Sequence, residues 1–187
     1  MILLEKMQKA KEFAAKVHEG QMYGKGIPYT VHLEAVVKLC YPYGNTAVVW
    51  AYLHDVLEDT KDLTRTEVGL VNEFGDHIYL GVVKLSDSPG NTRKQRKKRL
   101  HEELSKVDDE EPWGDVLVVK AADRLANMRA CVETNNQRLM RVYCGEYEDF
   151  KQACQRPGRA EDIWREIDQI YETHRSKAKR GPKPQTV

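Results

Sequence analysis

The sequence contains few cysteines, and they show none of the spacings that bind metals or form redox pairs. No two of its 4 cysteines are separated by only two residues, as a C-x-x-C motif would require. This pattern predicts reduced, buried thiols in a reducing compartment instead of disulfide bridges or a thiolate zinc site. The residues concerned are Cys40, Cys131, Cys144 and Cys154.

Long apolar runs and an excess of charge of one sign are also missing. No window approaches the roughly 18 apolar residues of a membrane span. The N-terminus carries Glu5 and Lys6 before an apolar run of signal length forms, so we expect a soluble, cytoplasmic protein without a secretory signal. The 30 basic and 29 acidic residues give a net charge of +1, which argues against a nucleic-acid partner.

The period-two alternation of β-strands is absent, and apolar residues instead recur at three- and four-residue steps. The 187 residues therefore predict a single all-α domain over 1–174, followed by a basic, disordered tail over 175–187. Thr64 and Glu67 have the spacing of a capping box and should open the fourth helix. The expected helices are 2–19, 31–39, 46–58, 64–74, 78–85, 93–104, 113–132, 137–155 and 160–174.

Four polar side chains interrupt an otherwise apolar segment at residues 51–60. His54, Asp55, Glu58 and Asp59 lie among Ala, Leu and Val. Each would cost on the order of 2 kcal/mol or more if buried without a partner. In a continuous helix over 46–58, His54 and Glu58 would be neighbours at i and i+4, as would Asp55 and Asp59. An imidazole beside a carboxylate suits a divalent cation, although an exposed helix can carry the same residues.

Two more metal-binding residue types occur in apolar helical contexts. His32 begins the second expected helix, and Asp123 lies in Val118-Val119-Lys120-Ala121-Ala122-Asp123. With His54 and Asp55 they would give two nitrogen and two oxygen donors and no thiolate, which suits Mn²⁺ better than a closed structural zinc site. The alternatives are that His32 is a hydrogen-bonded core histidine and that Asp123 pairs with an arginine.

With these residues, the sequence resembles the HD-domain metal-dependent phosphohydrolases, and among them the hydrolase domain of the RelA/SpoT family, including its small stand-alone alarmone hydrolases. The Glu58-Asp59-Thr60 sequence after His54-Asp55 narrows the resemblance to this branch. The matching elements are His18-Glu19-Gly20-Gln21, Pro28-Tyr29-Thr30-Val31-His32, Leu53 to Thr60, Phe74-Gly75 and Lys120 to Arg129. The resemblance implies an HD-domain helical bundle.

The resemblance also implies the site and the reaction. His32, His54, Asp55 and Asp123 would bind the metal, typically Mn²⁺ although other divalent cations are possible. Glu58 and Asp59 would activate the nucleophilic water and handle protons, and Asn127 would lie near the bound nucleotide. The family reaction removes the 3′-pyrophosphate of guanosine tetra- or pentaphosphate, (p)ppGpp, the alarmone of the stringent response, and gives GDP or GTP and pyrophosphate.

A substrate with so many phosphates needs cations beyond one metal ion. The candidate cations are Lys25, Arg93, Lys97, Arg138 and Arg141. Tyr23 is a departure, because this position of the family is usually an arginine that stacks on the guanine. Tyr23 can stack on a base but supplies no charge.

The alternatives are therefore an HD phosphohydrolase of another nucleotide, such as a 5′-nucleotide, a dNTP or a 2′-phosphorylated cofactor, and a catalytically idle nucleotide-binding module. The oligomeric state is left open.

Overall fold

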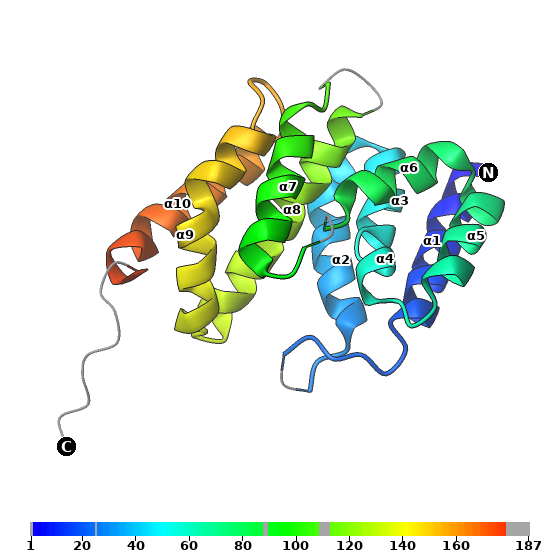
Figure 1. Cartoon of the computed structure of the whole chain (residues 1–187), viewed down its shortest axis with the longest axis horizontal. Coiled ribbons are helices and arrows are strands. Elements are labelled where there is room, and N and C mark those ends of the chain that lie inside the picture. Colours follow the sequence, from blue (N-terminus) through cyan, green and yellow to red (C-terminus); the bar gives the residue numbers. More distant parts are fainter. Residues whose placement is uncertain (1, 25, 88–89, 109–112, 179–187) are drawn as a thin grey trace.

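The structure, a computed structural model, describes residues 2–24, 26–87, 90–108 and 113–178. Its regular elements within these ranges are all helical (Figure 1), which confirms the all-α prediction. The elements are α1 (Ile2–Val17), α2 (Tyr29–Cys40), the 3₁₀ turn η1 (Tyr41–Tyr43), α3 (Asn45–Leu53), α4 (Val56–Asp59), α5 (Leu63–Phe74), α6 (Asp76–Leu85), α7 (Arg93–Ser105), α8 (Gly114–Glu133), α9 (Gln137–Cys154) and α10 (Glu161–Ala178).

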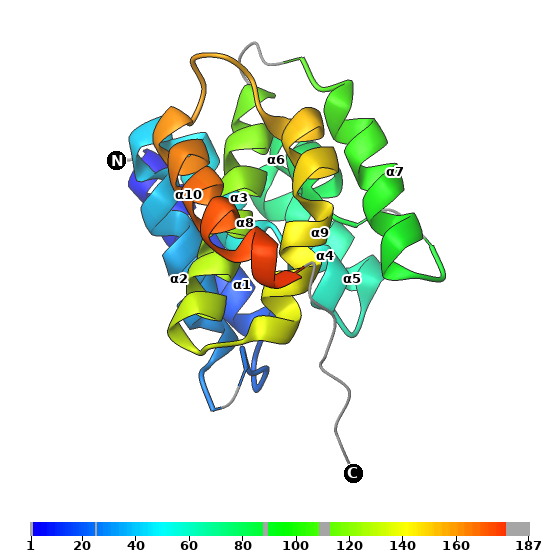
Figure 2. The same ribbon diagram turned by 90° about the vertical axis from the view of Figure 1, so that its left-hand side faces the viewer.

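Helix α8 lies at the centre of the bundle and contacts α2, α3, α6, α9 and α10. Figures 1 and 2 show α9 and α10 on one side of α8, with α1 to α6 on the other side. Most of α8 is buried, including the unbroken run from Gly114 to Ala122. A helix that is apolar on nearly all sides belongs inside a core. Polar side chains within this buried part of α8 therefore lie in the interior of the protein.

The predicted continuous helix over 46–58 is wrong, because it is interrupted at His54 and Asp55. Helix α3 ends at Leu53 and α4 begins at Val56, and Asp55 has φ −107° and ψ 0°. These angles lie in the sparsely populated bridge region, where many active-site residues are found. The two rows of i and i+4 neighbours do not form on one helix, so the placement of these side chains depends on tertiary contacts.

The start of α5 also differs from its prediction. Asp62 is the N-cap, and its carboxylate accepts a hydrogen bond from the backbone N–H of Arg65 at 3.0 Å, so Thr64 lies inside the helix. A complete capping box is found instead at the start of α7, between Thr92 and Gln95. Either Asp62 or Thr64 can cap a helix chemically, so local sequence alone does not decide between them.

The end of the chain is helical for longer than predicted. Helix α10 continues through Arg175 to Ala178, and the rest of the predicted tail, 179–187, lies outside the described residues. All four cysteines are buried and unbridged. No described helix combines the length and the apolar character that a membrane crossing requires.

Candidate metal centre

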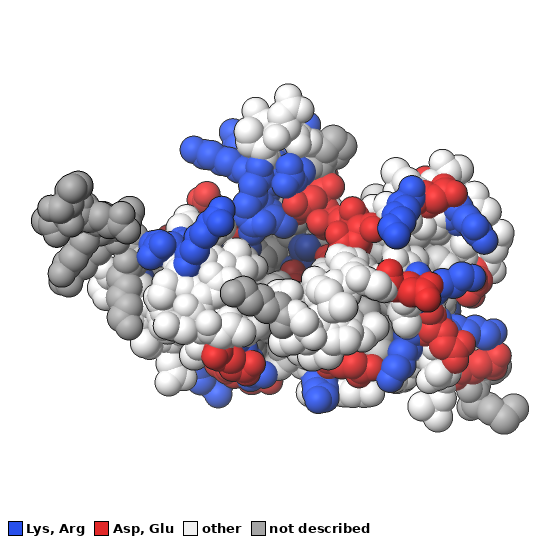
Figure 3. Space-filling model, turned by 90° about the horizontal axis from the view of Figure 1, so that it is seen from below, with Lys and Arg blue, Asp and Glu red and all other residues white. Residues whose placement is uncertain are grey.

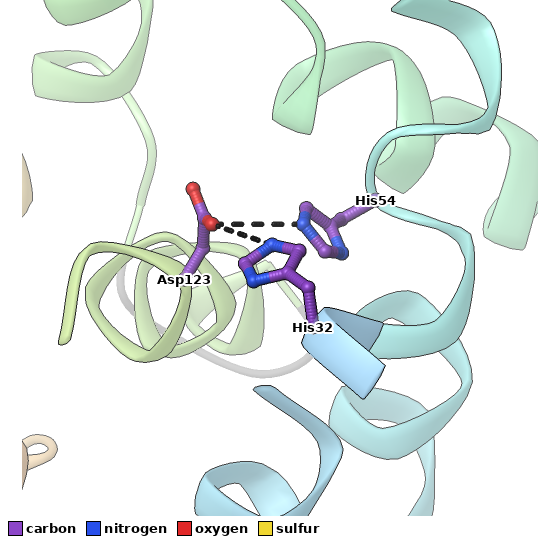
Figure 4. A group of neighbouring side chains, drawn as sticks. All are labelled: His32, His54 and Asp123. Atoms are coloured by element: carbon purple, nitrogen blue, oxygen red, sulfur yellow. Dashed lines mark ion pairs between the residues drawn. The ribbon is translucent and has the colours of Figure 1, made fainter. Parts of the chain in front are cut away.

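Three elements that are distant in the sequence bring His32, His54 and Asp123 together. His32 comes from α2, His54 follows α3 directly, and Asp123 projects from the central helix α8 (Figure 4). Asp123 Oδ1 lies 3.2 Å from His32 Nε2 and 3.7 Å from His54 Nε2. One ligand atom from each residue lies within 4.8 Å of the other two.

The imidazole of His54 is held in the orientation that a metal ligand needs. It is fully buried, and its Nδ1 lies 2.7 Å from the carbonyl oxygen of Ala51. With the proton on Nδ1, the backbone carbonyl fixes the tautomer, and Nε2 presents a lone pair to the site. His54 Nε2 is buried and has no hydrogen-bond partner among the described residues. A cation bound at Nε2 would satisfy this atom.

Asp55 adds a second carboxylate to the cluster. Its Oδ2 lies 3.0 Å from His54 Nε2 and 3.9 Å from His32 Nε2. The same oxygen accepts a hydrogen bond from the hydroxyl of Tyr29 at 2.5 Å. A carboxylate oxygen can accept more than one interaction, so this bond leaves Oδ2 able to ligate an ion.

The spacing and chemistry of these donors fit a divalent cation. Donors about 2.1 Å from one ion lie at most about 4.2 Å apart, and the nitrogen–oxygen distances here run from 3.0 to 3.9 Å. Burial alone would raise the pKa of Asp123, but His32 and His54 outweigh it and hold that pKa well below its usual value. The carboxylate is therefore ionised, as a metal ligand must be.

The two predicted catalytic carboxylates lie on α4, directly after the cluster. Glu58 is exposed, and its Oε1 accepts a hydrogen bond from the backbone N–H of Asp87 at 2.7 Å. Surrounding protein atoms raise the pKa of Glu58 by desolvation, and the charge of Asp55 raises it further. Asp59 is half-buried, and its Oδ2 accepts a hydrogen bond from Gln21 Nε2 at 2.8 Å.

The sequence analysis did not single out Lys120, which belongs to the same surroundings. Lys120 is only 5% exposed, and it lies one helical turn before Asp123 on α8. Burial would lower the pKa of Lys120, but the carboxylates of Glu58 and Asp123 outweigh it and keep the ammonium charged. Its ammonium makes no hydrogen bond with the residues that the structure describes. The sequence did contain a sign of this role, a lysine inside an apolar run. That lysine was interpreted only as one residue of the expected helix.

Tyr23 lies between the predicted metal ligands and a pocket, and Asn127 connects it to Asp123. The ring of Tyr23 stacks on that of His32, with 4.7 Å between centroids and 13° between planes. The Tyr23 hydroxyl donates to Asn127 Oδ1 at 2.8 Å, and Asn127 Nδ2 donates to Asp123 Oδ1 at 2.6 Å. Tyr23 and His32 line a mostly apolar pocket of about 1040 Å³ between α2 and α8.

The basic residues proposed to bind the substrate phosphates lie less close to the His and Asp cluster, or pair with other residues. Arg93 forms a bidentate pair with Glu146 at 2.7 and 3.2 Å, and Lys97 contacts Asp87 at 2.5 Å. Two further candidates, Arg138 and Arg141, are exposed on α9, and within the described part of the chain neither pairs with the His and Asp cluster. Lys25 lies outside the described residues.

A hollow is visible on the face of the molecule shown in Figure 3. Acidic and basic atoms both appear at its floor, and a group of Lys and Arg side chains borders it. Such a surface offers carboxylates to a cation and positive charge to phosphates.

The chain is similar in sequence to known proteins. The chain is 31% identical over 145 residues to a GTP pyrophosphokinase of Myxococcus xanthus, covering 74% of this chain and 19% of that protein. It is 32% identical over 134 residues to a guanosine-3′,5′-bis(diphosphate) 3′-pyrophosphohydrolase of Haemophilus influenzae, covering 69% of this chain and 19% of that protein. The chain thus spans about a fifth of the length of these relatives.

A solved structure shares the fold. It is described as a metazoan orthologue of SpoT that hydrolyses ppGpp and plays a role in starvation responses. It superposes with a TM-score of 0.73 at 20% identity, over 90% of this chain and 94% of the other. The HD domain family matches residues 10–145, a range that contains all four residues of the His and Asp cluster. The chain therefore belongs to the HD domain family.

Proposed function

We propose that the protein is a metal-dependent guanosine 3′,5′-bis(diphosphate) 3′-pyrophosphohydrolase, which converts (p)ppGpp and water to GDP or GTP and pyrophosphate. The observation that carries this proposal is the convergence of His32, His54 and Asp123 on one point, with Asp55 beside them and two further carboxylates on α4. The name of the Haemophilus influenzae relative supports the choice of substrate.

His32, His54, Asp55 and Asp123 would hold the metal, and Mn²⁺ suits their mixed nitrogen and oxygen donors. A divalent cation at this point supplies positive charge to the scissile phosphate and acidifies water. Because these side chains are fixed by α2, α8 and the turn after α3, the centre requires little rearrangement to accept an ion.

Glu58 and Asp59 would handle the protons of the reaction. Hydrolysis breaks the bond between the 3′ oxygen and phosphorus, so one proton leaves the attacking water and one reaches the departing oxygen. Asp59 is oriented by Gln21 and is suited to take the proton from water. Glu58, whose pKa is raised, keeps a proton more readily than an ordinary glutamate and is suited to give it to the departing oxygen.

The pocket beside Tyr23 would take the nucleoside, and the basic residues near α7 would face its phosphates. Tyr23 lines the pocket and donates to Asn127, which contacts Asp123 of the metal centre. Tyr23 offers a ring without a charge to a base, which is the observation that favours a second candidate, an HD phosphohydrolase of another nucleotide. The candidate phosphate contacts remain Lys25, Arg93, Arg138 and Arg141.

The proposal extends to the rest of the chain. The catalytic domain would comprise residues 1–174, with the basic segment 175–187 outside it. The enzyme would act in the cytoplasm and lower the alarmone level in the stringent response.

Product analysis tests this function directly. Protein stripped of metal with EDTA is assayed with and without Mn²⁺ on ppGpp, GTP, dGTP, a 5′-nucleotide and a 2′-phosphorylated cofactor. We expect Mn²⁺-dependent release of pyrophosphate and GDP from ppGpp, and loss of turnover with retained Mn²⁺ binding in the Glu58→Gln/Asp59→Asn variant. Faster hydrolysis of another nucleotide would favour the second candidate. Bound Mn²⁺ without turnover on any of them would identify a binding module.

A further inference from the structure

A short loop between α1 and α2 covers the metal centre, and its own hydrogen bonds define its shape. Met22 and Pro28 form an isolated antiparallel bridge. The backbone N–H of Tyr23 donates to the carbonyl of Ile27 at 2.7 Å, and that of Tyr29 donates to the carbonyl of Gln21 at 3.0 Å. Residues on alternate positions of such a bridge point to the same side. The bridge thus directs Gln21, Tyr23 and Tyr29 toward the site.

Tyr29 makes the direct contact with the predicted metal ligands. Its hydroxyl donates to Asp55 Oδ2, the same oxygen that lies 3.0 Å from His54 Nε2. Asp55 occupies the break between α3 and α4, so a regular helix does not fix the direction of its side chain. The Tyr29 hydroxyl supplies the constraint that the helix does not.

Tyr29 is itself held from its other side. Its ring stacks on that of His18, with 4.5 Å between centroids and 22° between planes. His18 is 3% exposed, and its Nδ1 lies 2.8 Å from Gln21 Oε1. A phenol packed in this way has little freedom to move away from Asp55.

Tyr23 reaches the other ligand carboxylate through one intermediate residue. It donates to Asn127, which in turn donates to Asp123 Oδ1, and its ring covers the imidazole of His32. Two tyrosines, Tyr23 of the loop and Tyr29 at the first position of α2, therefore connect to three of the four predicted ligands.

We propose that Tyr29, and less directly Tyr23, are positioning residues that set the affinity of the centre for its metal. The inference rests on the metal site of the proposed function and not on the identity of the substrate. Outer residues that orient metal ligands typically contribute about 10- to 100-fold in metal affinity. Removing the Tyr29 hydroxyl leaves Asp55 free to rotate, so the ion loses a preorganised ligand.

Titration of metal-free protein with Mn²⁺, followed by electron paramagnetic resonance of the free ion, tests this inference. We expect the Kd of Tyr29→Phe to rise about 10- to 100-fold and that of Tyr23→Phe to rise less than about tenfold. Tyr79→Phe is the matched control, because it also removes a hydroxyl bonded to a carboxylate, that of Glu67 at 3.1 Å on the α5–α6 pair. The control should bind Mn²⁺ like the wild type.

Two further readouts separate positioning from a general structural role. The thermal midpoint of metal-free Tyr29→Phe should lie close to that of the wild type, and saturating Mn²⁺ should restore most of its turnover. Wild-type Mn²⁺ affinity in both tyrosine variants would overturn the inference, as would a wild-type protein that binds no Mn²⁺. A wild type that binds Mn²⁺ but does not hydrolyse ppGpp would refute the proposed function alone, provided that the variants still bind the metal more weakly.

Discussion

Replacing Lys120 by Met should strengthen the binding of a divalent cation and weaken the hydrolysis of an anionic substrate. The ammonium of Lys120 is buried on α8 near the carboxylates of Glu58 and Asp123, and it makes no hydrogen bond within the described residues. Met has a similar length and no charge, so the substitution removes the charge and leaves most of the packing. The two expected effects have opposite signs because the metal and the substrate carry opposite charges.

The size of the effect on the cation follows from Coulomb's law. Lys120 and the predicted ligand Asp123 are three residues apart on α8, a spacing at which Cβ atoms lie about 5–6 Å apart. A unit charge at a separation on the order of 7 Å repels a divalent ion by about 1 kcal/mol at the dielectric constant of water and by about 5 kcal/mol at an effective value of 20. Even the smaller energy corresponds to about a fivefold change in affinity at 25 °C. We therefore expect the Kd for Mn²⁺ to fall at least about fivefold in Lys120→Met.

The loss of catalysis should be larger. Removing one preorganised positive or hydrogen-bonding group at a site of developing negative charge typically costs about 10²- to 10³-fold in kcat. Pyrophosphate release from ppGpp at saturating Mn²⁺ measures this loss, and calorimetric titration with Mn²⁺ measures the gain in cation binding. Lys98→Met, which removes the same charge from a side chain 77% exposed on α7, is the control and should change neither quantity.

The reasoning fails if Lys120→Met binds Mn²⁺ more weakly than the wild type while its thermal midpoint is unchanged. Such a result would mean that the ammonium organises the carboxylates instead of competing with the ion. Unchanged turnover in the variant would show that Lys120 does not act on the phosphates.

Two other predictions concern the site and its support. Because desolvation first and then Asp55 raise the pKa of Glu58, and because Glu58 must be protonated to give a proton to the departing oxygen, kcat/KM should fall as the pH is raised through a value above the ordinary 4.5 of a glutamate. A pH–rate profile without such a fall would contradict this. Gly81→Ala should destabilise the fold by about 1–3 kcal/mol, because its new Cβ would lie 2.1 Å from the ring of Trp50. Thermal unfolding should show a lower midpoint for it, whereas Gly145→Ala, with open space around it, should match or exceed the wild type.

Most of the helices and the grouping of His32, His54 and Asp123 could be predicted from the sequence, but the local geometry around them could not. Periodicity reports which residues are apolar, and the run from Ala47 to Leu57 is apolar almost throughout, so it favours one helix. The helix is interrupted after Leu53, where residues that are distant in the sequence contact each other, such as Tyr29 and Asp55. A pattern confined to one segment contains no information on such a partner.

The same limit applies to the charged residues. Arg93 was selected as a phosphate ligand from a basic run, yet it pairs with Glu146, which lies 53 positions further along the chain. Arg124 donates to Oε2 of the same carboxylate at 3.0 Å, an oxygen that Arg93 also contacts. Two guanidinium groups thus share one carboxylate, and the group retains a positive charge that composition alone does not reveal.

Cations also outnumber carboxylates around Asp87. Such local groups explain how a chain of nearly neutral net charge can offer positive charge to an anion. Lys97 and Arg96 lie 2.5 and 3.5 Å from the two oxygens of Asp87, whose backbone N–H donates to Glu58. Together with Lys120, these two cations place three positive charges beside the two carboxylates of Asp87 and Glu58, so one positive charge remains. The acidic residues at the α3–α4 break, on α4 and on α8 can therefore collect a metal ion while the start of α7 stays positive. A polyphosphate bridging the two sides would meet the metal at one phosphate and this excess positive charge at the others.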